Sequence, residues 1–153
     1  MQITRTTDFE LLARLNKPIQ DLHASLHPEF FNEYNLETVR EVFRHWVTRE
    51  DFIFLVLEDG DESMGYAWVE VKDYSGNAFR KPGKSLFVHH ISIVEGHQAK
   101  GYGSKLMNYI YDMARQLDIS LVELNYWADN TGAEHFYHRQ GFETSRVTVR
   151  KAL

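Results

Sequence analysis

The spacing of apolar residues changes at residue 52, and this change limits the folds that the chain can adopt. Before that point apolar residues recur every three or four positions, as on the buried face of a helix. They are Leu12, Leu15, Ile19, Leu22 and Leu26, then Leu36, Val39, Phe43, Trp46 and Val47. Residues 52–57 are instead continuously apolar, as in a buried strand, and the Asp-Gly pair within 58–62 predicts a hairpin turn. The chain therefore combines helices with a sheet.

After this hairpin the chain alternates strands with helices. The expected strands cover 3–5, 52–57, 66–71, 86–94 and 121–127, and the expected later helices cover 101–117 and 131–140. The last segment, 142–153, predicts one strand or two short ones. Pro18 either kinks the first helical segment or begins a second helix. A hairpin next to β-α-β units implies an α/β (α+β) fold with helices flanking a mixed sheet.

Length, composition and charge narrow the class of protein. A chain of 153 residues with 43% hydrophobic residues is expected to form a single domain over 1–153. The absence of cysteine excludes disulfides, thiolate metal sites and a cysteine nucleophile, and it fits a cytoplasmic setting. The net charge of −5 disfavours nucleic acid and favours a cationic small molecule or a basic peptide as partner. No apolar run approaches the ~18 residues that span a bilayer, so we expect no membrane association.

A glycine-containing loop precedes the helix expected at 101–117. Gly101 and Gly103 let the backbone approach a ligand, and the helix start directs free N–H groups and the positive end of its dipole to the same place. Such a site suits a phosphate or pyrophosphate. The segment matches neither the P-loop nor Gly-x-Gly-x-x-Gly, because Leu106 stands at the third glycine position. Taken alone, it fits an ordinary helix start with incidental glycines equally well.

Two motifs in this half of the chain resemble those of the GNAT superfamily of N-acetyltransferases. The stretch Gln98-Ala99-Lys100-Gly101-Tyr102-Gly103 is similar to its pyrophosphate loop, Gln/Arg-x-x-Gly-x-Gly/Ala. Its second hallmark, Asn-x-x-Ala-x-x-Phe-Tyr-x-x-x-Gly-Phe, is matched at Asn130, Ala133, Phe136, Tyr137, Gly141 and Phe142. The resemblance is firm over 86–142 and weaker over the whole chain. It implies the GNAT fold, with about 6–7 strands and about four helices around a mixed sheet that splays between its fourth and fifth strands.

The resemblance also implies a site for acetyl-CoA as co-substrate, without a metal, between the strands at 86–94 and 121–127. The pantetheine arm would pair with Ile91, Ser92 and Ile93. The pyrophosphate would lie on the amides of Gln98, Ala99, Lys100, Gly101, Tyr102, Gly103 and Ser104. Asn130 would hold the cofactor arm, cap a helix, or do both. Lys100, Lys105 and Arg139 would either contact phosphates or remain solvated surface charges.

For catalysis, the resemblance assigns Tyr137 as the acid that protonates the leaving thiolate; the alternative is an ordinary tyrosine on an apolar helix face. The positions where relatives carry a basic carboxylate are here Phe87 and Asn125, which cannot act. The remaining candidates are His89, on the strand face of Phe87, and Glu123. Both histidines of this strand can also be merely hydrogen-bonded, and His90 is expected to point the other way. Proton removal through ordered water, or without a dedicated base, stays open.

The implied function is an N-acetyltransferase that moves an acetyl group from acetyl-CoA to a primary amine of a small molecule or peptide. The reaction would proceed by direct attack in a ternary complex. The first two helices and their loop would cover a cationic acceptor. The aromatic side chains of this segment would either line the acceptor slot or belong to the core; the segment carries His23, His27, Phe30, Phe31 and Tyr34. The carboxylates that would attract it are Asp21, Glu29, Glu33 and Glu70. The alternative is an acyl-CoA-binding sensor without turnover, and the chain would act as a monomer or a homodimer.

Overall fold

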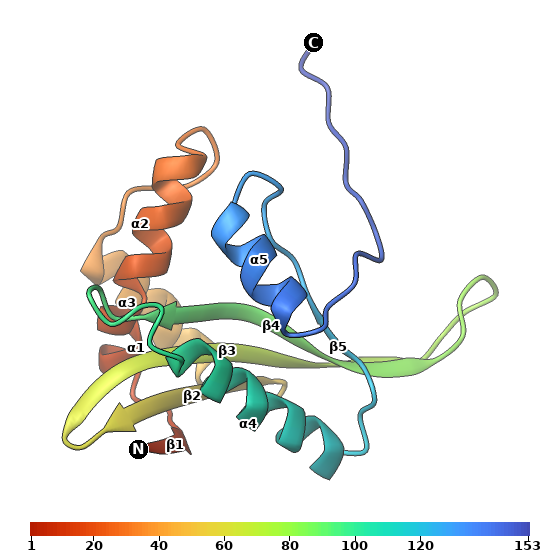
Figure 1. The fold of residues 1–153 in the computed structure, drawn as a ribbon. Helices are drawn as coiled ribbons and strands as arrows, with labels where there is room; N and C mark the ends of the chain where they lie inside the picture. Colours follow the sequence, from red (N-terminus) through yellow and green to blue (C-terminus); the bar gives the residue numbers. More distant parts are fainter.

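The computed structural model describes residues 1–153 and contains five strands and five helices (Figure 1). The strands are β1 (Gln2–Arg5), β2 (Phe52–Asp59), β3 (Glu62–Tyr74), β4 (Gly83–Ile93) and β5 (Val122–Leu124). The helices are α1 (Phe9–Leu15), α2 (Lys17–Leu26), α3 (Leu36–Trp46), α4 (Tyr102–Gln116) and α5 (Thr131–Arg139). The strands form one sheet in the order β1-β2-β3-β4-β5, and only the pair β4–β5 is parallel. The predicted α/β fold with a mixed sheet is confirmed, with fewer strands and one more helix than expected.

The additional helix begins next to Pro18. Asn16 ends α1 and also precedes the first residue of α2, and Pro18 lies in the first turn of α2. A proline is tolerated there because the first N–H groups of a helix have no partner within it. Pro18 therefore begins a second helix instead of kinking one long helix. None of the helices is both long and apolar enough to cross a membrane.

Each face of the sheet carries an apolar layer, because successive side chains of a strand point to opposite sides. The layer that packs on α4 includes Leu55, Leu57, Ala67, Val69, Leu86, Val88, Leu106 and Ile110. The layer that packs on α1 and α3 includes Leu12, Leu15, Phe43, Phe54, Val56, Tyr66 and Trp68. The two lists alternate along residues 53–57 of β2 and 66–69 of β3, so strand periodicity assigns these residues to their faces.

The strands β4 and β5 are paired over a short stretch only. Residues 86–88 of β4 lie opposite residues 122–124 of β5, and β4 then continues to Ile93 while the chain leaves β5 toward α5. The predicted splay between the fourth and fifth strands is therefore present. Beyond Val88, one edge of β4 has no strand beside it.

The strand or strands expected over 142–153 are absent. The chain after Phe142 forms no helix or strand, and in Figure 1 it runs away from the body of the protein. None of its backbone groups makes a hydrogen bond within the protein. Val147 and Val149 are 72% and 86% exposed. The expectation was wrong because β propensity produces a strand only where another strand offers a ladder of partners.

A chain of polar groups, of which Asn16 and Tyr66 are buried and His90 is partly buried, joins the first two helices to the sheet. The Asn16 side-chain amide donates to the Tyr66 hydroxyl at 2.9 Å, and this hydroxyl lies 2.8 Å from Nδ1 of His90. Burial lowers the pKa of His90 to about 3, so its ring is neutral near pH 7. Burial also raises the pKa of Tyr66, so the phenol keeps its proton. The Tyr66 hydroxyl therefore donates to His90 and accepts from Asn16.

The lowered pKa of His90 should make the protein less stable in mild acid. His90 titrates near pH 6.5 in an unfolded chain but at about 3 in the folded protein. Between these pH values the unfolded chain binds the extra proton, so the free energy of unfolding falls as pH falls, by about 1.4 kcal/mol per pH unit from this site. Urea denaturation between pH 7.5 and 4.5 measures the slope. The variant His90→Asn, which cannot titrate, should show a shallower slope, and an unchanged slope would refute the assignment.

Candidate active site

The start of α4 presents a group of backbone N–H donors without partners. Gly101 precedes the helix with a φ of 86°, and no side chain caps the helix. Ala99 also has a positive φ, of 60°. None of the amides from Gln98 through Ser104 donates a hydrogen bond within the protein. Since the positive end of a 15-residue helix dipole lies at the same place, this loop fits a phosphate or pyrophosphate group.

The three cations expected near this loop form no ion pair. Lys100 is exposed and forms no ion pair, and Arg139, at the end of α5, is likewise exposed and unpaired. Lys105 lies in the first turn of α4, and its ammonium group contacts the sulfur of Met1 at 2.8 Å. The donors that could receive a phosphate at this loop are therefore backbone N–H groups, and these three side chains remain candidates for additional contacts.

The open edge of β4 offers further unpaired backbone groups. The Val94 amide donates to the carbonyl of Met64, so the alternating pattern directs the backbone groups of Ser92 toward β3 and those of Ile91 and Ile93 toward the open edge. The Ile93 carbonyl accepts from the Gln98 side chain at 3.2 Å. Ser92 is 2% exposed, and its hydroxyl donates to the Leu15 carbonyl at 2.8 Å. Of the three predicted residues, Ile91 and Ile93 face the splay, and Ser92 ties α1 to the sheet.

Helix α5 brings Asn130 and Tyr137 to the same region. The Asn130 side-chain oxygen accepts from the Ala133 amide at 3.1 Å, so this residue does cap α5. The Tyr137 ring packs between Tyr126, Phe136 and Phe142. Burial raises the pKa of Tyr137 to about 12, so its hydroxyl stays protonated at neutral pH. That hydroxyl has no hydrogen-bond partner in the protein and is a free proton donor.

A side chain that the sequence reasoning missed fixes α5 against the start of α4. The Gln140 amide nitrogen donates to the Ser104 hydroxyl at 3.0 Å, and its oxygen accepts from the Tyr111 hydroxyl at 3.2 Å. Gly103 permits this close approach, because an added Cβ would lie 3.2 Å from the Phe136 ring. The N-terminus of α4 and the helix that carries Tyr137 are thus held together. Gln140 falls at an unspecified position of the matched motif, which gave no signal for it.

A β-bulge in β4 places two consecutive histidines on one face of the sheet. Trp68 of β3 lies opposite His90, whereas Val69 lies opposite Val88, so His89 is the extra residue. The rings of both histidines contact the Trp68 ring, at centroid distances of 4.0 Å for His89 and 5.0 Å for His90. The expectation that His90 points the other way is therefore wrong. A strict alternation of side chains fails wherever a bulge inserts a residue.

His89 is paired with a carboxylate from the neighbouring strand. Its Nε2 lies 2.6 Å from a carboxylate oxygen of Glu70, and the two side chains are 24% and 19% exposed. Because a carboxylate only accepts, Nε2 carries the proton and Nδ1 keeps a lone pair. Burial lowers the pKa of His89, and Glu70 opposes that shift. The result is a neutral, oriented imidazole, which is the form a general base needs.

The other candidate base, Glu123, lies near this pair. Its neighbours Val122 and Leu124 pack into the α4 layer, so Glu123 points to the opposite face. It lies opposite Phe87 in the parallel register, on the face that also carries His89. No hydrogen bond or ion pair involves it. The structure thus gathers His89, Glu70 and Glu123 on one face near the splay, and it gathers no group of side chains suited to a metal ion.

Aromatic side chains close the end of this face. Trp127, after β5, lies 4.1 Å from the ring of His27 and contacts Phe30 and Phe31 at 5.7 and 5.8 Å. His23 stacks on Phe31 and reaches toward His90 at 6.3 Å. Nε2 of His27 is also hydrogen-bonded to Oδ1 of Asp129 at 2.9 Å. The end of α2 and its following loop are therefore joined to the segment between β5 and α5.

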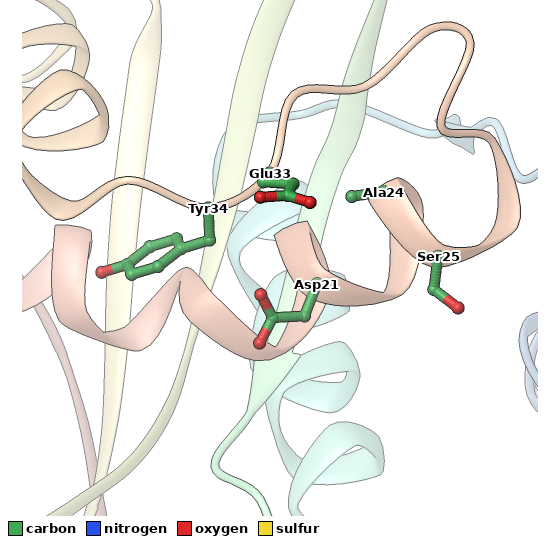
Figure 2. A pocket seen from close by; sticks show the side chains of 5 residues that line it. All are labelled: Asp21, Ala24, Ser25, Glu33 and Tyr34. Atoms are coloured by element: carbon green, nitrogen blue, oxygen red, sulfur yellow. The ribbon is translucent and has the colours of Figure 1, made fainter.

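Tyr34 does not belong to this aromatic group. Its hydroxyl donates to the Ala13 carbonyl at 2.8 Å. As Figure 2 shows, it lines a separate hollow of about 380 Å³ between α2 and the following loop, together with Asp21, Glu33, Ala24 and Ser25. Asp21 is already paired with Lys17. The predicted acceptor segment thus divides between two places, and only His23, His27, Phe30 and Phe31 lie with Trp127.

Comparisons with known proteins bear on the family and the fold. Residues 19–142 match the model of the acetyltransferase (GNAT) family. The uncharacterized N-acetyltransferase YdgE of Bacillus subtilis is 22% identical over 102 residues, which are 67% of this chain and 61% of that protein. Thus the chain spans less than two thirds of that relative's length. A crystal structure of a mutant BH1408 protein from Bacillus halodurans shares the fold with a TM-score of 0.92 at 21% identity, covering 100% of this chain and 99% of the other. A possible acetyltransferase from Clostridium difficile gives a TM-score of 0.77 at 14% identity, covering 99% and 96%.

Proposed function

Because the chain belongs to the acetyltransferase (GNAT) family, we propose that it is an N-acetyltransferase that uses acetyl-CoA to acetylate a primary amine. The observation that carries the proposal is the presence of two groups of features around the splay. One group is a helix start with free backbone amides and an open strand edge. The other is a protonated Tyr137, which packs against the α4 layer, and an oriented His89–Glu70 pair, whose imidazole stacks on Trp68 of the other layer. One group of features suits a long phosphate-bearing donor, and the other suits proton transfer to and from reacting atoms.

The residues present fit acetyl-CoA. The free amides of 98–104 would receive its pyrophosphate, and the open edge at Ile91 and Ile93 would pair with its amide-containing arm. Asn130, whose oxygen is used in the cap, keeps its amide nitrogen for the same arm. Bound there, acetyl-CoA supplies an activated acetyl group as a thioester.

His89 would take the proton of the acceptor. A primary amine is mostly an ammonium ion at pH 7 and attacks a thioester only after losing a proton. Nδ1 of His89 has the lone pair for this step, and Glu70 holds the ring through Nε2. As the new N–C bond forms and the C–S bond breaks, the Tyr137 hydroxyl would give its proton to the departing sulfur. His89 would thus take a proton from the attacking amine, and Tyr137 would give a proton to the departing thiolate.

The acceptor should carry a positive charge. The face around His89 holds Glu70 and Glu123, and Asp129 lies beside the aromatic group that closes it. The chain as a whole has a net charge of −5. Exposed aromatic rings such as Phe30, 57% exposed, add faces that attract cations. A small polyamine-like molecule or a basic peptide fits these features best.

Release of free CoA thiol from acetyl-CoA in the presence of a panel of primary amines tests the function directly. Acceleration by at least one cationic amine supports the proposal. If calorimetry shows tight CoA binding but no amine accelerates release, the protein is an acyl-CoA sensor instead. That second function is favoured by one observation, the presence of Phe87 and Asn125 where relatives carry a carboxylate.

Substitution of Gly101 should weaken CoA binding by about tenfold or more. Its φ of 86° is unfavourable for a β-branched residue, costing roughly 1–2 kcal/mol, so Gly101→Val displaces the loop that carries the free amides. Gly60→Val is the matched control, because Gly60 also has a positive φ and open space around it but lies in the β2–β3 turn. Calorimetric titration with CoA gives both affinities. Equal affinities for the two folded variants would place the phosphate site elsewhere.

A further inference from the structure

His90 carries a hydrogen-bond donor that no group in the protein uses. Nδ1 of His90 accepts from the Tyr66 hydroxyl at 2.8 Å, and that hydroxyl accepts from the Asn16 amide at 2.9 Å. A neutral imidazole has one N–H, so its proton lies on Nε2. Nε2 makes no hydrogen bond within the protein, and it is not fully buried. The tautomer therefore leaves one N–H donor open to a ligand.

The direction of this donor is set by buried neighbours. Asn16 and Tyr66 are 3% and 0% exposed, so water does not compete for the hydrogen bonds that orient the ring. The Trp68 ring contacts the imidazole edge to face, with a centroid distance of 5.0 Å and an interplanar angle of 89°. A side chain that is held in this way by packing and by further hydrogen bonds presents its donor in one direction.

The donor lies between the proposed base and the aromatic group that closes this face. His89 and His90 are consecutive, and the bulge in β4 places both rings on the same face, where each contacts Trp68. On the other side, the His23 ring of α2 lies 6.3 Å from the His90 ring and stacks on Phe31. An acceptor whose amine reaches His89 therefore has Nε2 of His90 close to its reacting end.

The surroundings of the donor favour a neutral oxygen over a charged group. Burial lowers the pKa of His90 to about 3, and burial together with His27 lowers the pKa of His23, so both rings are neutral near pH 7. An ammonium group has only donors and cannot accept from an N–H. A carboxylate would join a face that already carries Glu70 and Glu123. An amide carbonyl accepts a hydrogen bond without adding charge.

We propose that the acceptor is a peptide or an aminoacyl amide acetylated on its α-amine, and that its first carbonyl oxygen accepts a hydrogen bond from Nε2 of His90. This inference rests on the proposed acetyltransferase function and chooses between its two classes of acceptor. Only two carbon atoms separate the α-amine of a peptide from that oxygen, so the two groups suit the neighbouring residues His89 and His90. A polyamine has no such oxygen, and it would displace water from the donor without replacing the hydrogen bond.

Acetyl transfer to a matched pair of peptides tests the inference. The first peptide is arginyl-alaninamide, which is cationic and has a single primary amine. The second carries sulfur in place of the first carbonyl oxygen and accepts a hydrogen bond only weakly. After correction for the fraction of unprotonated amine, kcat/KM should favour the oxygen peptide by about tenfold, as one hydrogen bond contributes. Spermidine, a polyamine without a carbonyl, should react more slowly than the oxygen peptide.

A variant of His90 connects this preference to its donor. His90→Leu removes the N–H and should bring the ratio of the two kcat/KM values close to one. His45→Leu makes the same change at an exposed position of α3 and should leave the ratio unaltered. A general loss of stability would lower both rates without changing their ratio, and circular dichroism checks the fold. The comparison of the two peptides on the unaltered protein needs no variant, so it decides the inference even where His90→Leu does not fold.

Three results would overturn the inference and leave the proposed function standing, because an amine is still acetylated. They are equal kcat/KM values for the two peptides, a preference that His90→Leu leaves intact, and faster transfer to spermidine than to the oxygen peptide. Transfer to no amine would instead contradict the proposed function. Calorimetric binding of the two peptides to the CoA-loaded protein then decides the inference by itself. A preference for the oxygen peptide that disappears in His90→Leu supports the carbonyl site, and equal affinities reject it.

Discussion

Tyr137→Phe is expected to lower kcat by about 10²–10⁴-fold while leaving CoA affinity nearly unchanged. The substitution removes one hydroxyl and keeps the ring that packs against Tyr126, Phe136 and Phe142. That hydroxyl has no partner in the protein, so its loss breaks no internal hydrogen bond. An acid used only as the thiolate departs contributes to the transition state and not to binding, and its loss therefore appears in kcat.

Steady-state thiol release and calorimetry with CoA separate these two effects. Tyr126→Phe is the matched control, because it removes a hydroxyl from the ring stacked on Tyr137 at 6.0 Å. Since the pKa of Tyr137 is about 12, the hydroxyl keeps its proton between pH 6 and 10, so its ionisation should cause no loss of activity in that range. An unaltered kcat at saturating acetyl-CoA would show that the hydroxyl is not the acid.

His89→Gln is expected to lower kcat/KM at pH 7 by about 10²-fold or more and to remove one limb of the pH profile. In the unaltered protein the rate should rise with pH as His89 loses its proton and then level off. Burial lowers the pKa of His89, so that rise should be centred below pH 6.5. The variant should recover activity at high pH, where more of the amine is already unprotonated.

The variant Glu70→Gln tests whether Glu70 orients the His89 ring for catalysis or only supports the sheet. Glu70 raises the pKa of His89 against the stronger effect of burial, so its neutralisation should move the acidic limb to still lower pH. A variant that only loosens the sheet would lower the rate at every pH without moving the limb. Identical pH–rate profiles for the unaltered protein and His89→Gln would eliminate this histidine, and Glu123→Gln would then be the variant to measure.

The parts of this protein that sequence predicts well depend on residues close together in the chain. The loop before α4 needs only Gly101 and the helix that follows it, and the cap of α5 needs only Asn130 and Ala133. The alternation along β2 and β3 likewise assigns apolar residues to two layers without knowledge of the partners. Such features follow from local geometry, so one sequence is enough to recognise them.

The parts that sequence missed depend on how distant strands align. The pairing of His89 with Glu70 requires the β3–β4 register and the β4 bulge at His89, neither of which has a local signal. The same bulge reversed the expected direction of His90. The segment after Phe142 has the composition of a strand, but a strand also needs a neighbour, and none is present within one chain. Register and partners are properties of the assembled sheet.

The hydrogen bond from Gln140 to Ser104 fixes the distance between the loop before α4 and Tyr137. Ser104 stands at the end of the loop that would hold the pyrophosphate, and Gln140 fixes to it the helix that carries Tyr137. The span between the two is therefore built into the scaffold and does not depend on the acceptor. A donor whose arm is one or two atoms longer or shorter would bring its sulfur to the wrong depth, however well its phosphates bind. If the proposed donor binds there, selection for the length of the donor would be separate from selection for the amine, and the two could change independently as sequences diverge.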